Sequence, residues 1–218
     1  MNALEKLLSV ARQEMNWDVR KLAVHFVSSG LPHHALNRLR THLLIQSGIR
    51  IGQNAAIGGP LRITGPGDVA SLFSIGDGSF VSGPLHVDLG ARVKIGARVY
   101  IGDDVKLLTG THEIAESQQR CGSQRWAPIE IGDGSWIGSA VTILPGATIG
   151  NGAIIGAGAV VTGNVPPDTL YAGVPARFVR DLEGGEQSKS SAPQSGIRIV
   201  NAARADTHPP PPRVAVGR

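Results

Sequence analysis

Residues 51–165 repeat a pattern in which an aliphatic side chain recurs at every sixth position. The first series is Ile51, Ile57, Ile63, Val69, Ile75, Val81 and Val87; after a slip of two residues the spacing resumes as Leu89, Ile95, Ile101 and Leu107, and it returns as Ile131, Ile137, Ile143, Ile149, Ile155 and Val161. Glycine often follows the aliphatic residue directly, and a small or β-branched residue usually stands four positions after it. A fixed short period predicts a stacked solenoid, in which each hexad supplies a short strand and a corner and the aliphatic side chain fills the interior.

Two segments interrupt the period. Residues 60–74 keep the spacing but lose the glycine positions, which indicates an irregular coil or a small loop. Residues 108–128 (LTGTHEIAESQQRCGSQRWAP) break the pattern altogether and predict a polar loop. Because functional residues are often carried on loops that a rigid scaffold positions, this loop is the first place to look for chemistry.

Leucine spacing predicts two helices ahead of the solenoid. Residues 1–28 place Leu4, Leu7, Leu8, Ala11 and Met15 at helical spacing, and a second helix is expected from Pro32 to Gln46, with Leu36, Leu39, Leu43 and Leu44 on one face. Such helices could anchor the chain at a membrane surface, or they could cap the open end of the solenoid or pack on a neighbouring subunit. Their polar face is not strongly basic, which favours the cap or the subunit contact over a membrane anchor.

Composition after Arg180 shifts to Gly, Ser, Pro and scattered charge, so we expect residues 184–218 to be disordered. The expected organisation is therefore a helical segment over 1–48, a solenoid domain over 49–183 with the loop 108–128, and a disordered tail over 184–218.

Overall composition limits the function classes. The chain has 218 residues, 29 glycines and 4% aromatic residues, which fits a narrow core lined by aliphatic side chains. Of the net charge of +4, most lies in residues 184–218, so the folded part has no basic footprint for nucleic acid. Cys121 is the single cysteine, which excludes an intramolecular disulfide and fits a cytoplasmic protein. No apolar run approaches the length of a membrane span and no signal peptide is evident, so neither is expected.

One stretch carries a specific resemblance. TGTHEI, followed by PIEIGDGSWIGSAVTILPGATIGNGAIIGAGAVVTGNVPPDTLYAGVPARFVR, resembles the hexapeptide-repeat acetyltransferases, with the galactoside and maltose acetyltransferases and the polysaccharide O-acetyltransferases as the nearest types. The close match covers residues 107–180, and a looser repeat match begins at residue 51. The resemblance implies an all-β, left-handed parallel β-helix, a homotrimer with active sites between subunits, acetyl-CoA as co-substrate, and no metal.

The resemblance also implies roles for individual residues. Acetyl transfer to a hydroxyl needs a base that takes the hydroxyl proton, and His112 stands at the matching position. The backbone N–H of Ser139 is implied as the donor to the oxyanion, with Trp136 lining the thioester and acceptor cleft. The coenzyme A positions are Ala157, Thr162, Arg177 and Arg180, the arginines meeting the phosphates. The lysine that often follows the matching threonine is replaced here by Gly163.

On the acceptor side the sequence departs from the galactoside-type pattern. Ser82 stands where those enzymes have an acceptor-binding asparagine, and Ser123 stands where they have a glutamate that orients the histidine. Glu113, Glu116 or a backbone carbonyl could orient His112 instead. Asp88 and His86, near Ser82, are further candidates for the acceptor site. These departures argue against free galactosides and maltose as acceptors.

The predicted function is an acetyl-CoA-dependent O-acetyltransferase that modifies a sugar hydroxyl in exopolysaccharide or lipopolysaccharide assembly. The alternatives are an N-acetyltransferase of an amino-sugar nucleotide, a serine O-acetyltransferase, and a non-catalytic β-helix scaffold. A zinc-dependent carbonic anhydrase on the same helix needs histidines at ligand spacing, whereas only His86 and His112 lie within the repeats.

Overall fold

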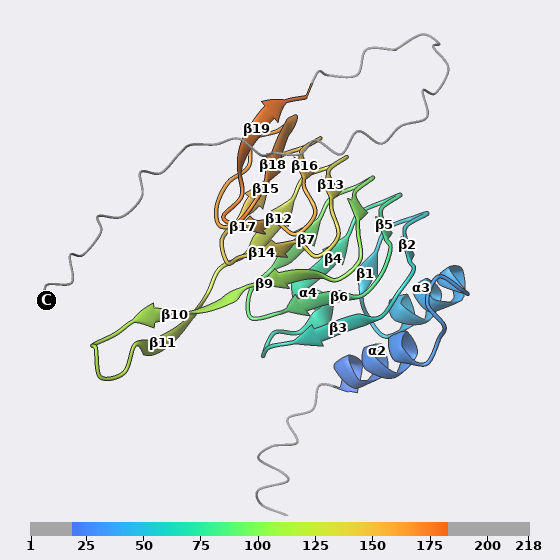
Figure 1. Ribbon diagram of the computed structural model, residues 1–218. Helices are drawn as coiled ribbons and strands as arrows, with labels where there is room; N and C mark the ends of the chain where they lie inside the picture. Colours follow the sequence, from blue (N-terminus) through green and yellow to red (C-terminus); the bar gives the residue numbers. More distant parts are fainter. Residues whose placement is uncertain (1–18, 183–218) are drawn as a thin grey trace, which may run out of the picture. The chain divides into compact units, whose positions relative to one another are not determined.

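The computed structural model describes residues 19–182, which fold into a parallel β-solenoid of about six turns (Figure 1). This is the left-handed parallel β-helix that was expected. Residues 1–18 of the helix predicted over 1–28 and the predicted disordered tail over 184–218 lie outside the described residues.

Three sheets run along the solenoid. The first sheet contains, in order, β1 (Arg50–Ile51), β4 (Phe73–Ile75), β7 (Val93–Ile95), β12 (Ile129–Ile131) and β15 (Thr148–Ile149). The second contains β2 (Ala56–Ile57), β5 (Phe80–Val81), β8 (Tyr100–Ile101), β13 (Trp136–Ile137), β16 (Ile154–Ile155), β18 (Thr169–Ala172) and the antiparallel β19 (Arg177–Asp181). The third contains β3 (Leu61–Thr64), β6 (Leu85–Asp88), β9 (Val105–Leu108), β14 (Thr142–Ile143) and β17 (Val160–Val161).

Each coil passes from the first sheet to the second and then to the third. Two of the resulting corners matter for the site. The 2/3 corner, between the second and third sheets, includes Ser82, Asp103, Ser139 and Ala157. The 3/1 corner, between the third sheet and the first sheet of the next coil, includes Gly90, Thr109 and Thr162.

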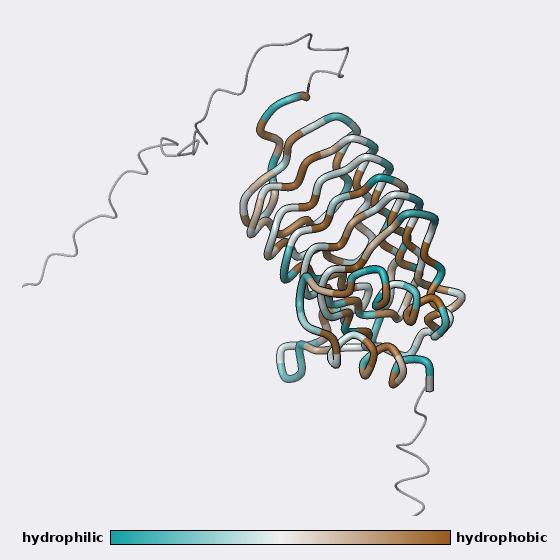
Figure 2. The backbone as a smooth tube through the Cα atoms, turned by 90° about the vertical axis from the view of Figure 1, so that its right-hand side faces the viewer, coloured by the Kyte–Doolittle hydropathy of each residue, from teal (hydrophilic) through white to brown (hydrophobic). Residues whose placement is uncertain are grey.

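The aliphatic residues of the hexads lie in register and form the core. In the first sheet Ile51, Ile75, Ile95, Ile131 and Ile149 pair in sequence from coil to coil. The small or β-branched residues four positions later are also buried, among them Ser79, Val99, Ser135, Val141, Ala147, Ala153 and Ala159. Figure 2 shows hydrophobic segments recurring from coil to coil. The prediction of a narrow aliphatic core is therefore confirmed.

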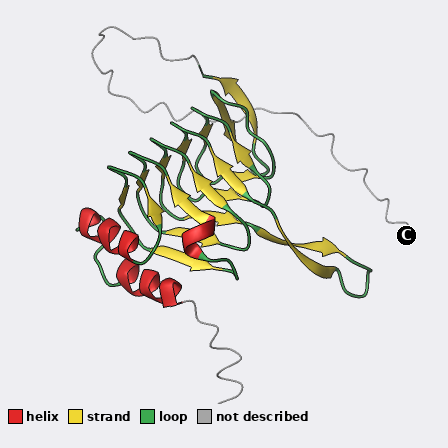
Figure 3. Ribbon diagram, turned by 180° about the vertical axis from the view of Figure 1, so that it is seen from behind, coloured by secondary structure: helices red, strands yellow, loops and turns green. Residues whose placement is uncertain are grey.

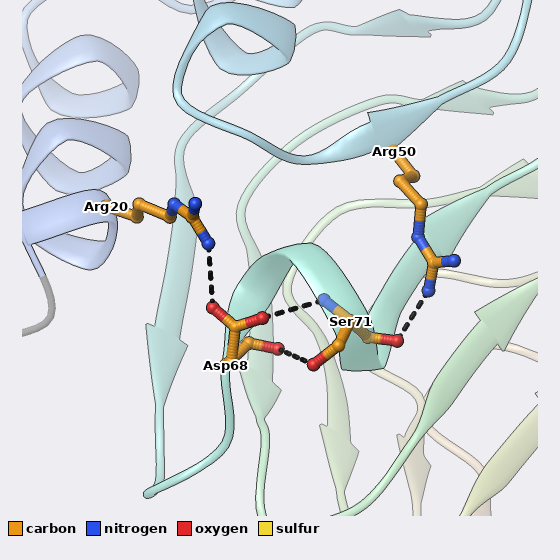
Figure 4. A network of polar contacts seen from close by, with 4 residues as sticks. All are labelled: Arg20, Arg50, Asp68 and Ser71. Carbon is orange, nitrogen blue, oxygen red and sulfur yellow. Dashed lines mark hydrogen bonds and ion pairs between the residues drawn. The ribbon is translucent and has the colours of Figure 1, made fainter.

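The irregular segment 60–74 contains one turn of helix, α4 (Val69–Leu72), so Val69 fills the core from a helix and not from a strand. Asp68 caps this helix, since its Oδ2 accepts the Ser71 N–H at 2.9 Å. Figure 4 shows that Asp68 also pairs with Arg20 of α2, while the Ser71 carbonyl accepts from Arg50 of β1. The insertion thus ties the helical segment to the first coil.

Two helices, α2 (Val19–Ser29) and α3 (Asn37–Gln46), pack on the strands of the first coil, as the cap hypothesis predicted (Figure 3). The predicted start of the second helix at Pro32 is wrong. His34 and Leu36 hold positive φ angles of 56° and 55°, which a helix cannot continue through, so α3 begins at Asn37.

The predicted leucine face of α3 is only partly the buried face. Leu44 is buried and Leu43 half-buried, but Leu36 and Leu39 are exposed, and Arg40 and Thr41 are buried in their place. The reason is that the first coil is an open edge with unpaired backbone groups. Thr41 Oγ1 accepts the Ile57 N–H at 3.0 Å, and Arg40 donates to the carbonyls of Ile57 and Gly58 at 3.3 and 2.9 Å.

The expected loop 108–128 is a β-hairpin. Strands β10 (Gly110–Ile114) and β11 (Cys121–Trp126) pair antiparallel, with His112 opposite Gln124. The hairpin leaves the solenoid at the 3/1 corner and projects away from it (Figures 1 and 3).

Candidate active site

His112 lies on the exposed strand β10 of the hairpin, and its ring has a defined orientation. Nδ1 is 3.0 Å from the backbone carbonyl of Gly122, on the opposite strand. A carbonyl oxygen only accepts, so Nδ1 must carry the hydrogen, and Nε2 of the neutral ring keeps a free lone pair. Of the alternatives considered for orienting His112, the structure has the backbone carbonyl.

Glu113 instead links the two strands of the hairpin. Its carboxylate accepts a hydrogen bond from Ser123 Oγ at 2.8 Å and lies 3.4 Å from the guanidinium of Arg125. Ser123, at the position of the orienting glutamate in the galactoside-type enzymes, is therefore one residue from the carbonyl that holds the histidine.

The root of the hairpin is held by Thr109 and Asp88. The fully buried Thr109 Oγ1 accepts the N–H groups of Gly90 and Ala91 at 2.9 and 3.2 Å and donates to the Asp88 carbonyl at 2.7 Å. The Asp88 carboxylate accepts the Gly110 N–H at 2.8 Å. Asp88, predicted as an acceptor-site candidate, is thus engaged at the root of the hairpin through one carboxylate oxygen.

A second group of predicted residues gathers at the 2/3 corner. Ser82, Ser139 and Ala157 follow β5, β13 and β16, three strands of the second sheet. Ser139 Oγ accepts the Asp103 N–H at 3.2 Å. Within residues 19–182 the Ser139 N–H itself has no hydrogen-bond partner, and Ser139 is exposed, so this N–H is available to an external acceptor.

Trp136 stands beside this corner on the outer face of the second sheet, where it pairs with Tyr100 and is 52% exposed. Phe80 and Tyr100 continue the row on the neighbouring strands, with ring centroids 5.6 Å apart. Sequence reasoning missed these two rings. The available signal was that all three aromatics directly precede an inward-facing residue of the hexad series.

The remaining predicted coenzyme A positions lie in the last coils. Thr162 follows β17 at the 3/1 corner and is exposed, whereas Arg177 and Arg180 lie on the exposed strand β19. Among the described residues their guanidinium groups donate hydrogen bonds only to nearby carbonyls, at 3.1 Å to Ala176 O and 3.4 Å to Asp181 O. Both guanidinium groups are therefore open to an anionic ligand.

A single chain does not bring these groups together. His112 projects from the 3/1 corner on the hairpin, while Ser139, Ala157 and Ser82 lie at the 2/3 corner on the other edge of the third sheet. In the part of the chain that the structure describes, no helix is long and apolar enough to cross a membrane, and no group of three His, Cys, Asp or Glu side chains could hold a metal ion.

Comparison with known proteins gives a consistent set of similarities. The family model described as "Bacterial transferase hexapeptide (six repeats)" matches residues 128–163. The galactoside O-acetyltransferase of Escherichia coli is 34% identical over 143 residues, which cover 66% of this chain and 68% of that protein. A provisionally named acetyltransferase of Schizosaccharomyces pombe is 46% identical over 93 residues, 43% of this chain and 45% of that protein. The chain thus spans only about half the length of some of the curated relatives that it matches.

Solved structures show the same similarity. A hexapeptide-repeat acetyltransferase from Vibrio cholerae superposes with a TM-score of 0.65 at 27% identity, covering 77% of this chain and 93% of that one; the same protein has been solved with acetyl-CoA. A galactoside acetyltransferase in complex with coenzyme A gives a TM-score of 0.65 at 30% identity, covering 75% of this chain and 79% of that one.

Proposed function

The chain belongs to the hexapeptide-repeat acetyltransferase family, and from this premise we propose that it transfers the acetyl group of acetyl-CoA to a sugar hydroxyl, with His112 as the general base. The observation that carries the proposal is the hydrogen bond from His112 Nδ1–H to the Gly122 carbonyl. It leaves Nε2 as the acceptor that a general base requires.

The proposed reaction runs through a tetrahedral intermediate. Nε2 of His112 takes the proton of the acceptor hydroxyl as the hydroxyl oxygen attacks the thioester carbonyl. Ser139 is exposed and its N–H has no partner within residues 19–182, which supports a role as donor to the oxyanion that forms. Collapse breaks the carbon–sulfur bond, and the imidazolium returns its proton to the departing coenzyme A thiolate, which restores His112.

The proposal includes a homotrimer with active sites between subunits, and the placement of these groups supports sites that two copies share. His112 and Ser139 lie on different edges of one chain, so the hairpin of one copy must reach the 2/3 corner of another to assemble the site. Closed cyclic symmetry lets each copy give its hairpin to one neighbour and receive one from the other. Three copies are the state that the family resemblance implies.

The co-substrate proposal assigns backbone groups of Ala157 and Thr162 to the pantetheine arm, and Arg177 and Arg180 to the phosphates. Its support is the exposure of all four residues and the coenzyme A or acetyl-CoA bound in the two solved relatives. Two guanidinium groups on one exposed strand suit a phosphate-bearing ligand, because their forked donors match its oxygens.

The acceptor in this proposal is a saccharide of exopolysaccharide or lipopolysaccharide assembly. Ser82, half-buried at the 2/3 corner, and Trp136 are proposed to contact it. A serine reaches less far than an asparagine, so an acceptor other than a free galactoside is expected. A cytoplasmic location is part of the proposal and rests on the single cysteine.

The test is acetyl-CoA turnover, followed by thiol release, over a panel of nucleotide sugars, lipid-linked sugars and oligosaccharides. We expect His112→Ala to lower kcat by about 10²–10⁴-fold, the usual contribution of a positioned general base. His42→Ala, at an exposed histidine of α3, is the matched control and should retain full activity. An amide product, or turnover that does not depend on His112, would contradict the proposal.

A further inference from the structure

A groove of about 1140 Å³ lies on the outer face of the third sheet, between α2 and the strands β3, β6 and β9. Its lining carries three permanently cationic side chains, Lys21, Arg62 and Lys106, against one carboxylate, Asp104. His25 and His86 complete the polar lining. The groove is therefore a positively charged site that the proposed transfer chemistry does not use.

The register of the sheet explains why the charges gather. Arg62, His86 and Lys106 are paired positions on the three adjacent parallel strands. Inward-facing Leu61, Leu85 and Val105 precede them, so all three side chains point outward in one row. Neighbouring strands are about 4.8 Å apart, so the positive charges of Arg62 and Lys106 lie close to each other along the row.

Within residues 19–182 neither the guanidinium of Arg62 nor the ammonium of Lys106 makes a hydrogen bond or an ion pair. His86 lies between them and bonds to Thr64 Oγ1 at 2.9 Å. Burial lowers the pKa of His86 most and the charge of Arg62 lowers it further; Asp88 opposes them, and Lys106 has the smallest effect, again lowering the pKa. Two cationic side chains without an ion-pair partner among the described residues therefore flank His86, an arrangement that suits an anionic ligand.

The groove also lies between the two edges that carry the predicted site. At the 2/3 corner it includes Pro84, which is two residues after Ser82. It also includes Asp104, which follows Asp103, the residue whose N–H donates to Ser139 Oγ. At the 3/1 corner it includes Gly65, next to the Asp88 carboxylate at the root of the His112 hairpin. A ligand in the groove would extend toward the acceptor position at Ser82.

We infer that this groove binds the phosphate or pyrophosphate group of an anionic saccharide acceptor, with Arg62 and Lys106 as its principal ligands. The inference rests on the proposed function and narrows it to phosphate-linked sugars. Arginine and lysine suit this ligand because both donate charge-assisted hydrogen bonds to phosphate oxygens. The shared chemistry fits a sugar nucleotide and a lipid-linked sugar pyrophosphate alike.

Coenzyme A is a poorer fit for the groove, although it also carries phosphates. Arg177 pairs with β18, which lies three strand spacings beyond β8 of the third coil, a separation of about 14 Å along the solenoid. The groove belongs to the first three coils and to a different sheet from β19.

The first experiment measures binding of inorganic pyrophosphate by calorimetry to the full chain and to the double variant Arg62→Ala/Lys106→Ala. The wild type is expected to bind, and the double variant to bind at least tenfold more weakly. Lys94→Ala/Arg98→Ala, which removes two exposed cations away from the groove, is the matched control and should bind as the wild type does. This measurement needs no turnover, so it stands even if no acetyl transfer is found.

The second experiment compares KM for one sugar as a neutral glycoside, as a nucleotide diphosphate sugar and as a short-chain prenyl pyrophosphate sugar. The double variant should raise KM for the phosphorylated acceptors alone and leave kcat and the KM for acetyl-CoA unchanged. Of the two phosphorylated acceptors, the one for which the wild type has the lower KM indicates whether the natural acceptor is a sugar nucleotide or a lipid-linked sugar.

Three results would overturn the inference. Equal pyrophosphate binding by the wild type and the double variant would show that Arg62 and Lys106 do not bind the phosphate. A rise in the KM for acetyl-CoA would assign the groove to the co-substrate. If the double variant differs from the wild type in oligomeric state on gel filtration, the row of Arg62, His86 and Lys106 is a subunit contact.

Discussion

His86 is a side chain whose ionisation the structure fixes in direction. Burial and the charges of Arg62 and Lys106 lower its pKa from the ordinary value of 6.5, with Asp88 opposing them. We expect the His86 ring signals in an NMR titration to have a midpoint below 6.5, identified by their loss in His86→Gln. A midpoint above 6.5 would contradict the burial of the ring between the two cations as the structure has it.

The same shift predicts how stability depends on pH. Between the lowered pKa of the folded state and 6.5, the unfolded chain binds more protons at this position than the folded chain does. The contribution of His86 to stability is therefore complete above 6.5 and is lost as the pH falls through this range. Urea unfolding at several pH values should show a shallower acid-side decline for His86→Gln than for the wild type.

Arg40 gives a second prediction, because its buried guanidinium satisfies carbonyls at the open edge of the solenoid. It donates to the carbonyls of Leu31 and Pro32 at 3.0 and 2.7 Å, in addition to those of Ile57 and Gly58. Arg40→Met keeps most of the side-chain volume but leaves buried acceptors unpaired, so we expect a loss of about 3 kcal/mol or more in the free energy of unfolding. Arg38→Met, at an exposed position of the same helix, should change it little in the same urea titration.

At the scale of single residues, the aliphatic pattern did not predict which side chains the helices bury. The leucine spacing of 36–44 pointed to a face that is largely exposed, because the surface beneath α3 is an edge of orphan backbone groups. Arg40 and Thr41 satisfy that edge, and nothing in a hydrophobic period shows where such an edge lies.

Among the elements, the hairpin β10–β11 depends on one buried hydroxyl. Thr109 Oγ1 joins Gly90, Ala91 and Asp88 at the point where the strand that carries His112 leaves the solenoid. Thr109→Val keeps the shape and removes these bonds, leaving two half-buried N–H groups without their acceptor. We expect kcat to fall about tenfold or more because His112, the proposed base, is displaced, with the KM for acetyl-CoA unchanged.

Thr111→Val is the matched control for Thr109, since Thr111 lies on the same hairpin and is exposed. It should retain the wild-type kcat, and Thr109→Ser should restore most of the activity because it returns the hydroxyl. If Thr109→Val loses activity only in proportion to folded protein measured by circular dichroism, the residue is structural and does not position His112.

The elements could be predicted where the period holds and not where it stops. The hexad series located nearly every strand of the three sheets, because a repeated layer imposes the same requirement on every coil. Val69 kept the spacing but lies in α4, since an aliphatic residue fills the core equally well from a helical turn. The hairpin was read as a loop because both its strands are exposed and have no buried face to leave a pattern.

For the whole molecule, the residues of the predicted site stand in the order of the family motif, but their spacing along the chain does not show which corner each occupies. The structure adds that His112 and Ser139 lie on different edges. In a solenoid, moving along the sequence changes the position around the coil as well as the position along the axis. Residues that are close in the sequence can therefore lie on different edges and face different neighbouring subunits. The assembly of the site is therefore a property of several chains in our proposal.

Mixing two inactive variants tests this assembly directly. His112→Ala removes the base from one edge, and Trp136→Glu places a charge on the other edge, where the thioester is proposed to lie. In mixed trimers formed from equal amounts of both chains, a site is intact only when the hairpin comes from a Trp136→Glu chain and the 2/3 corner from a His112→Ala chain. Random assembly therefore restores about one quarter of the wild-type activity, because each cyclic interface draws its two sides independently. If each chain held a complete site, the mixture would stay at the activity of the parents, and the placement of the two edges would have to be explained without a second copy.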